Sequence, residues 1–207
     1  MRLAVFGAGG HGKVVADTAL QMGWQEVVFF EDAWPKRSHN GCWLIIGDAQ
    51  ALLQRLDDFQ GVIVGVGNNR IRLAKTRELA AHGARLVSVV HPSAVISPHA
   101  VLGRGSVVFA GAVIQVDSQL GEACIVNTRA CVDHDCHLAD GVHICPGASL
   151  AGSVEIGEAS WIGIGSSVKQ QVRLGSDVIV GAGAAVVCDV LDKQTVVGVP
   201  AKSLGRK

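Results

Sequence analysis

The sequence has 207 residues, enough for one large domain or two small ones with hydrophobic cores. Its 18 basic and 18 acidic residues give a formal net charge of zero, and the basic residues form no run beyond a short tail at Arg206 and Lys207. This balance argues against nucleic acid or an anionic membrane as the main partner, because both favour a positively charged patch.

No targeting or membrane-spanning segment is recognisable. The N-terminal residues MRLAVFGAGG lack the layout of a signal peptide, because glycine follows the short apolar run at once. No stretch approaches the roughly 20 apolar residues that a membrane span needs. The six cysteines are therefore expected to stay reduced, and we expect a cytoplasmic protein.

Residues 1–91 are predicted to form a small Rossmann-like α/β domain. Short apolar runs have the character of buried strands and occur at 2–6, 26–30, 61–66 and 85–90. Helices are expected between them, near 11–22, from Asp48 to Phe59, and from Asn68 or Asn69 to His82, with the polar residues as N-caps. Short connections between such elements favour a parallel sheet with right-handed crossovers. The segment 33–47 is ambiguous.

A different period begins at Val95. Residues 95–190 divide into sixteen unbroken hexads, from VISPHA to AVVCDV. The second position is Ile, Leu or Val in every hexad, and the sixth is always Ala, Ser, Cys or Val. In a left-handed parallel β-helix, each hexad forms one flat side and three hexads form a coil, so the aliphatic residues stack inside. The pattern predicts this fold for residues 92–207, with a short C-terminal tail.

Two glycine-rich loops indicate a nucleotide site in the first domain. The loop GAGGHG at 7–12 follows a strand and opens a helix, where backbone N–H groups can receive a phosphate. Glu31 and Asp32 end the next strand, where a ribose-binding acid lies in dinucleotide-binding domains. A second loop around Gly67 is expected at the same sheet edge. NAD is disfavoured because fewer than 95 residues leave little room for a second nucleotide-binding half. Alternatively, the glycines serve only close packing.

The β-helix concentrates its polar chemistry around the seventh hexad, at Asn127, Cys131, Asp133, His134, Asp135, Cys136, His137, His143 and Cys145. A histidine beside a carboxylate can act as a general base, which makes His134 the candidate. Zinc needs three or four ligands that converge on one point. These His and Cys residues occupy different sides or coils, so we expect no metal.

The whole chain resembles the NeuD/PglD group of bacterial sugar acetyltransferases. The resemblance is carried by VFGAGGHGKVVADTA, VGVGNNRIR, HPSAVISPHAVLG, VNTRACVDHDC, VHICPGASLAG, WIGIGSSV and VVGVPAK. Members acetylate sialic acids or the amino group of UDP- or GDP-linked 4-amino sugars. The resemblance implies a homotrimer with acetyl-CoA bound between neighbouring β-helices, and a nucleotide sugar rather than NAD in the N-terminal domain.

The resemblance also implies roles for individual residues. His134 matches the catalytic base and Asn127 lies near it. The acetyl-CoA site matches His143, Gly152, Ile164, Gly181 and Ala182, with the Gly152 N–H at the oxyanion. The nucleotide-sugar site matches Gly9, Gly10, His11, Glu31, Asp32 and Gly67. The related motif has Glu after the histidine, whereas this chain has the shorter Asp135, so Asp133 is a rival partner for the imidazole.

The sequence therefore predicts an acetyl-CoA-dependent N-acetyltransferase that acts on a nucleotide-linked 4-amino-deoxy sugar, with UDP as the favoured nucleotide. The expected mechanism is direct transfer, with His134 as general base. Three alternatives stay open. They are O-acetylation of sialic acid or a related sugar, a zinc enzyme of the β-helix carbonic anhydrase type, and a non-catalytic β-helix scaffold.

Overall fold

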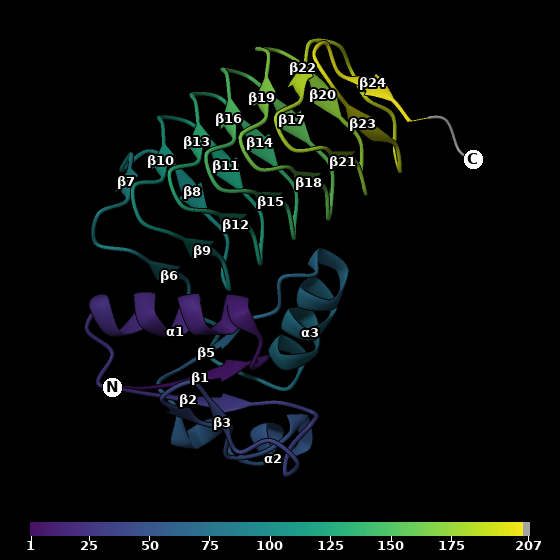
Figure 1. Ribbon diagram of the computed structural model, residues 1–207. Helices are drawn as coiled ribbons and strands as arrows, with labels where there is room; N and C mark the ends of the chain where they lie inside the picture. Colours follow the sequence, from purple (N-terminus) through teal and green to yellow (C-terminus); the bar gives the residue numbers. More distant parts are fainter. Residues whose placement is uncertain (205–207) are drawn as a thin grey trace. The chain divides into compact units, whose positions relative to one another are not determined.

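The computed structural model describes residues 1–204, so the predicted tail at Arg206 and Lys207 lies outside the described residues. The chain divides into two compact units (Figure 1). The first is Met1–Pro92, and the second begins at Ser93.

The first unit contains a parallel sheet of three strands in the order β2-β1-β5. These strands are β1 (Arg2–Phe6), β2 (Glu26–Phe30) and β5 (Gly61–Val64), and all of their central residues are buried. The helices α1 (Gly10–Gln21) and α3 (Asn69–Ala81) follow β1 and β5. The predicted strand at 85–90 is reduced to an isolated bridge between Leu86 and Val62 and the short β6 (Val89–Val90).

Both predicted N-caps of this unit are confirmed. Asp48 accepts a hydrogen bond from the Ala51 N–H at 2.8 Å, and Asn68 accepts one from the Ile71 N–H at 3.1 Å. The helix that follows Asp48 is shorter than predicted, because α2 (Ala49–Leu53) gives way to the 3₁₀ turn η1 (Leu56–Asp58). Phe59 already has an extended backbone before β5, so the helix cannot continue to it.

The ambiguous segment 33–47 forms a small antiparallel pair at the edge of β2. Its strands are β3 (His39–Asn40) and β4 (Trp43–Leu44). The pair is attached to β2 by a parallel bridge between Ile45 and Phe29, and the Trp43 ring packs edge-on against Phe29 at 6.2 Å.

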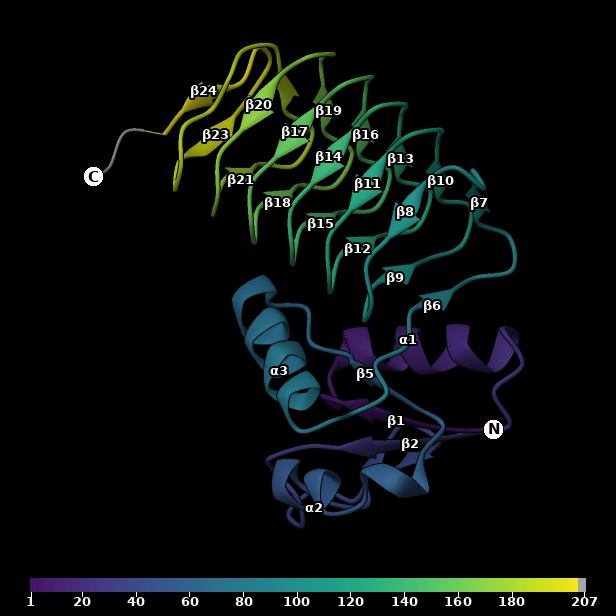
Figure 2. The same ribbon diagram turned by 180° about the vertical axis from the view of Figure 1, so that it is seen from behind.

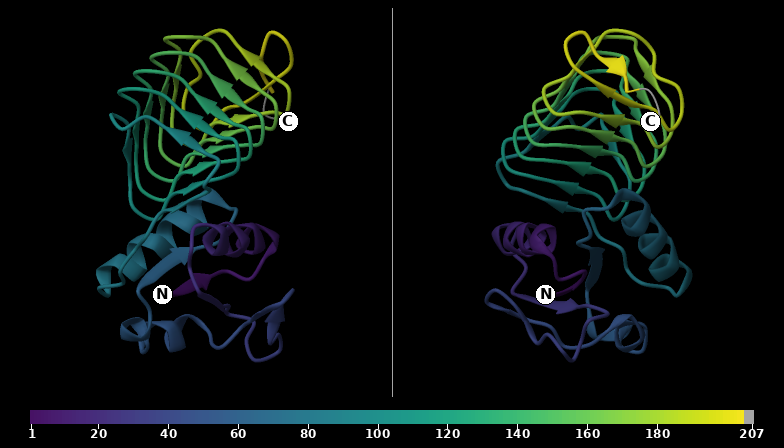
Figure 3. Two further views of the ribbon diagram at one scale, coloured as in Figure 1. Left: turned by 90° about the vertical axis from the view of Figure 1, so that its left-hand side faces the viewer. Right: turned by 45° about the vertical axis from the view of Figure 1, so that its right-hand side comes forward.

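The second unit is the predicted parallel β-helix, with three sheets as its sides (Figures 1, 2 and 3). Side 1 consists of β7 (Val95–Ile96), β10 (Val113–Ile114), β13 (Cys131–Val132), β16 (Ser149–Leu150), β19 (Ser167–Val168) and β22 (Ala185–Val186). Side 2 consists of β8 (Val101–Leu102), β11 (Gln119–Leu120), β14 (His137–Leu138), β17 (Glu155–Ile156) and β20 (Arg173–Leu174). Side 3 contains β9 (Val107–Val108), β12 (Ile125–Val126), β15 (His143–Ile144), β18 (Trp161–Ile162), β21 (Ile179–Val180), β23 (Thr195–Val197) and the antiparallel β24 (Lys202–Ser203).

The hexad positions have the predicted burial except at the start of the β-helix, where Ile96, Ala100 and Leu102 are only half-buried. Second-position residues are buried from Val108 to Val186, and sixth-position residues are buried from Ser106 to Val190. A further regularity, at the fifth position, was not predicted. Every fifth position from Gly105 to Gly183 has a φ between +53° and +70°. A residue with left-handed backbone conformation therefore turns the chain at each of these corners, and this residue is often not glycine.

Candidate active site

His134 lies at the corner between sides 1 and 2, directly after β13. Its imidazole Nδ1 lies 2.6 Å from Asp135 Oδ2, and its backbone N–H donates to Asp133 Oδ1 at 2.8 Å. Asp135 is therefore the carboxylate that contacts the ring, although it is one methylene shorter than the glutamate of the related motif. The hydrogen bond with Asp135 raises the pKa of His134, with smaller contributions from the charges of Asp133 and Asp135.

Gly152 lies at the same corner, one coil further along the β-helix. The backbone carbonyl of His134 accepts the N–H of Ser153 at 2.9 Å, which ties the two coils together. The imidazole ring of His134 lies against the α-carbon of Gly152. Gly152 is itself buried, and its backbone N–H donates to no backbone carbonyl within residues 1–204.

A pocket of about 380 Å³ lies at the corner between sides 3 and 1. It brings together five predicted site residues, namely Asn127, His143, Ile164, Gly181 and Ala182. His143 is buried, its Nε2 lies 3.0 Å from Asn127 Nδ2, and its ring packs edge-on against Trp161 at 4.3 Å. The lining is mostly apolar, which suits a long and largely uncharged arm.

The structure separates Asn127 from His134 within one chain, contrary to the predicted proximity. Asn127 follows β12 at the corner before side 1, whereas His134 follows β13 at the corner after it. The hydrogen bonds of Asn127 go to His143 and to the backbone N–H of Thr128. The reason is geometric, because one hexad carries the chain across a whole side of the β-helix.

A pocket of about 370 Å³ lies at the carboxyl ends of the strands in the first unit. All of the residues predicted for the nucleotide sugar line it, namely Gly9, Gly10, His11, Glu31, Asp32 and Gly67. The carboxylate of Glu31 accepts the backbone N–H groups of Ala8 and Asp32, at 2.8 and 3.0 Å. Glu31 therefore also holds the first glycine loop in place.

The glycines of the two loops serve different purposes. A Cβ atom on Gly12 would collide with the carbonyl oxygen of Gly7, and one on Gly65 would lie 2.8 Å from the α-carbon of Gly12. These glycines are needed for close packing. A Cβ atom on Gly9 or Gly10 would meet nothing within 4 Å, so packing does not require glycine there. A side chain at either position would instead occupy space that a ligand can use.

Three supports of this pocket were missed by sequence reasoning, and two come from the ambiguous segment. Arg37 donates to the Ala8 carbonyl at 2.7 Å, and the buried Asn40 donates to the Gly9 carbonyl at 3.2 Å. The two side chains also contact each other, Arg37 Nη2 to Asn40 Oδ1, at 2.9 Å. No periodic pattern marks such residues, because their partners lie about 30 positions earlier in the chain.

The third support is Arg72, whose side chain is fully buried in α3. Its guanidinium donates to the carbonyls of Val66 and Gly67 at 3.1 and 3.0 Å, and to Asn69 Oδ1 at 2.9 Å. Burial, with a contribution from the Arg72 charge, lowers the pKa of His11 to about 4. His11 is thus neutral at neutral pH. An arginine one turn after the Asn68 cap was the available signal.

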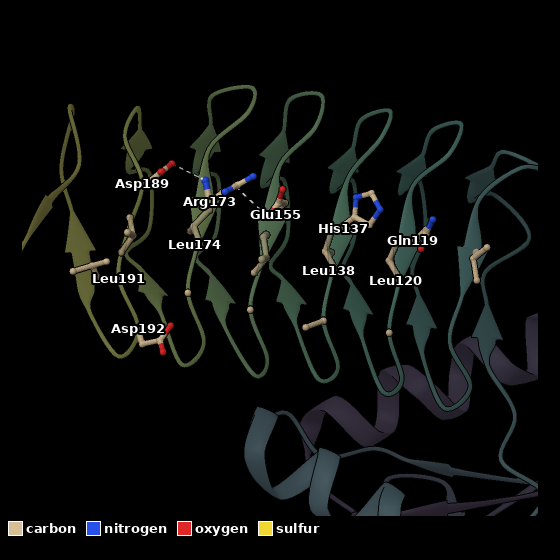
Figure 4. Close-up of a pocket in the computed structure, with 17 residues that line it drawn as sticks. Gln119, Leu120, His137, Leu138, Glu155, Arg173, Leu174, Asp189, Leu191 and Asp192 are labelled. Carbon is tan, nitrogen blue, oxygen red and sulfur yellow. Dashed lines mark hydrogen bonds and ion pairs between the residues drawn. The ribbon is translucent and has the colours of Figure 1, made fainter.

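Another cavity, of about 1020 Å³, lies on side 2 (Figure 4). Gln119, His137, Glu155 and Arg173 project from successive strands there, and Arg173 Nε lies 3.2 Å from Glu155 Oε2. None of the predicted site residues lines it. Within residues 1–204, no group of three or more His, Cys, Asp or Glu side chains is arranged to hold a metal ion. No helix in that range is long and apolar enough to span a membrane.

Comparisons with known proteins agree with both units. The PglD N-terminal domain family matches residues 2–79. UDP-N-acetylbacillosamine N-acetyltransferase from Bacillus subtilis is 36% identical over 107 residues, which are 51% of this chain and 50% of that protein. The match thus spans about half the length of this curated relative.

Two solved structures match over nearly the whole chain. The acetyltransferase domain of PglB from Neisseria gonorrhoeae is 48% identical, with a TM-score of 0.93 and coverage of 98% of this chain and 99% of that one. PerB from Caulobacter crescentus, solved with CoA and GDP-perosamine, is 38% identical, with a TM-score of 0.92 and coverage of 99% and 98%. The chain therefore belongs to the PglD-like family of hexapeptide-repeat sugar acetyltransferases.

Proposed function

We propose that the protein transfers the acetyl group of acetyl-CoA to the amino group of a nucleotide-linked 4-amino-deoxy sugar, with UDP as the nucleotide. The observation that carries the proposal is the hydrogen-bonded pair of His134 and Asp135 at a corner of the β-helix. The Bacillus subtilis relative is named for a UDP-linked sugar, and the PglB domain has been solved with acetyl coenzyme A. PerB, solved with GDP-perosamine, makes GDP the competing nucleotide.

The proposed mechanism is direct transfer without an acyl-enzyme. The sugar amine attacks the thioester carbonyl, and Nε2 of His134 takes the proton that the nitrogen loses, because Nδ1 is engaged by Asp135. Asp135 stabilises the resulting imidazolium. The N–H of Gly152 stabilises the oxyanion of the tetrahedral intermediate. Collapse of that intermediate breaks the C–S bond, and the CoA sulfur leaves with the proton that His134 holds.

A threefold assembly would complete the site. His134 and the pocket of His143 lie on the two corners that flank side 1. The first-position residues of side 1 are mostly small, namely Cys131, Ser149, Ser167 and Ala185. We propose that side 1 faces the threefold axis, so that the His134 corner of one copy meets the acetyl-CoA pocket of the next.

Coexpression of two inactive variants tests the shared site. His134→Ala removes the base, and His143→Ala alters the proposed acetyl-CoA pocket. Mixed trimers contain some interfaces in which an intact His134 corner meets an intact pocket. We expect about a quarter of wild-type activity from a random mixture, because one interface in four pairs two intact halves. Mixed trimers that are no more active than the two variants alone would contradict the shared site.

A thermal-shift panel tests the substrate class. The ligands are UDP- and GDP-linked 4-amino sugars, each with and without acetyl-CoA, together with NAD and CMP-linked or free sialic acid. We expect the UDP-linked amino sugars to raise the melting temperature most. Stabilisation by the GDP compounds alone would change the nucleotide, and stabilisation by NAD alone would overturn the proposal for the first unit. In an acetyl-transfer assay with the same compounds, acetylation of sialic acid without transfer to any amine would favour the O-acetyltransferase alternative.

A further inference from the structure

We infer that Gly152 is a positioning residue, and that the lack of a side chain there allows the imidazole of His134 to lie in line with Asp135. This inference rests on the proposed role of His134 as the base. It concerns the space above the ring, and it is separate from the contact that the Gly152 N–H makes with the oxyanion.

The contact between the two residues leaves no room for a methyl group. A Cβ atom on Gly152 would lie 2.5 Å from both Cε1 and Nε2 of His134 and 3.1 Å from Nδ1. Ordinary contacts between such atoms begin at about 3.5 Å. The ring would therefore have to move. It can do so, because the His134 side chain is 53% exposed and no core packing fixes it.

The backbone does not explain the glycine. Gly152 is not among the residues with a positive φ, which at this corner is the property of its neighbour Ser153. The equivalent fourth positions of other coils at this corner carry side chains, for example Val116, Gln170 and Cys188. The corner thus accepts a side chain elsewhere, and the imidazole is the group that a side chain at position 152 would displace.

The ring is thereby held between two neighbours. Asp135 holds Nδ1 from its own coil at 2.6 Å, and the bare α-carbon of Gly152 bounds the ring from the next coil. A ring pushed away by a methyl group loses its alignment with Asp135 and with the acceptor amine. Because a displacement of about 1 Å at a reacting group can lower the rate 100-fold, the effect should appear in turnover.

The test is Gly152→Ala, which keeps the backbone N–H and adds only the methyl group. We expect kcat to fall between about tenfold and 100-fold, with the KM for acetyl-CoA and the melting temperature close to wild type. The acid limb of the pH–rate profile should move to lower pH, because the ring loses the hydrogen bond that raises its pKa. Gln170→Ala, at the same corner one coil on, is the control and should retain wild-type kcat. An unchanged kcat and pH profile in Gly152→Ala would overturn the inference.

A double-mutant cycle separates this role from a structural one. If Gly152 acts only through the imidazole, then Gly152→Ala added to His134→Ala should cause no further loss of kcat. A further loss of the size seen in the single variant would overturn the inference, because the methyl group would then act independently of the ring. The proposed function fails separately, when His134→Ala alone retains wild-type turnover.

Discussion

The β-helix and the first unit support their candidate sites in different ways. In the β-helix, His134 and Gly152 occupy the same fourth position of hexads in successive coils, so the repeat itself brings them together. In the first unit, the first glycine loop is held by Arg37 and Asn40, which lie about 30 residues further along the chain, and the second loop is held by Arg72 at the start of α3. A repeat can thus bring residues together by register alone, whereas the pocket proposed for the nucleotide sugar needs long-range hydrogen bonds to hold its first glycine loop.

The difference implies different sensitivities to substitution. In the β-helix, replacement of an inward residue should lower the free energy of unfolding. Replacement of a single corner residue should lower kcat without loss of stability. In the first unit, substrate binding and stability should fail together, because the same side chains support both. The following four predictions test this contrast.

Replacement of an inward aliphatic residue should have the largest effect. Ile162 is fully buried and stacks between Ile144 and Val180. Ile162→Asp loses its burial and places a carboxylate in an apolar stack, so we expect the free energy of unfolding to fall by about 5 kcal/mol. Val101→Asp, at an exposed first position, is the control and should cost less than about 1 kcal/mol in urea unfolding. Similar losses for both variants would contradict the inward stacking.

The largest effect on turnover is expected for His134→Ala. Loss of a positioned base typically lowers the rate about 10²–10⁴-fold, so kcat should fall by that factor while the KM for acetyl-CoA and the melting temperature stay near wild type. His137→Ala removes a nearby exposed imidazole on side 2 and should leave kcat unchanged. Wild-type turnover of His134→Ala at pH 7 would exclude the general base.

Arg72→Met should affect binding and stability together. The substitution leaves the carbonyls of Val66 and Gly67 without their buried donor, so we expect a loss of about 3 kcal/mol in the unfolding of the first unit. The KM for the nucleotide sugar should rise at least about tenfold, with that for acetyl-CoA unchanged. In an NMR titration the pKa of His11 should rise towards its usual value. Arg55→Met, which breaks an exposed ion pair with Asp58, is the control.

Asp135→Asn should have the smallest effect on turnover, and the direction in which the pH–rate profile shifts follows from the pKa of His134. A base must be neutral, so kcat/KM falls as the pH drops through the pKa of His134, which Asp135 raises. Without the carboxylate, the acid limb should move to lower pH, and kcat at the optimum should fall about tenfold. Asp133→Asn should shift the limb less, because Asp133 bonds to the backbone N–H of His134. Equal shifts in both variants would contradict the specific pairing with Asp135.

The sequence predicted the β-helix well because its determinants are local. The aliphatic second position and the small sixth position repeat every six residues, and each has one physical cause. The left-handed fifth position was missed because residues as different as Asp135, Arg129 and Gly141 occupy it. The proximity of Asn127 to His134, which the resemblance implies, is not found within one chain, because six residues cross a whole side of the coil.

Prediction was less complete in the first unit. The caps at Asp48 and Asn68 depend on residues three positions apart, so local pattern identified them. Arg37 and Asn40 act on carbonyls about 30 positions earlier, which only the folded chain brings near them, and their residue types alone carry no such information. Arg72 acts on the carbonyls of Val66 and Gly67, six and five positions earlier, so a local signal was available there. The pocket lining was predicted by sequence, but the side chains that hold the loops were not.

The pocket at the corner between sides 3 and 1 takes its lining from successive coils, through Cys145, Gly163 and Gly181. Each coil raises the chain by one strand spacing, about 4.8 Å. The length of the lining along this corner can therefore change only by whole multiples of that spacing. Deletion of one 18-residue coil would shorten this lining by one such spacing without moving it sideways. The number of coils that line this corner therefore sets the length of ligand that can lie along it.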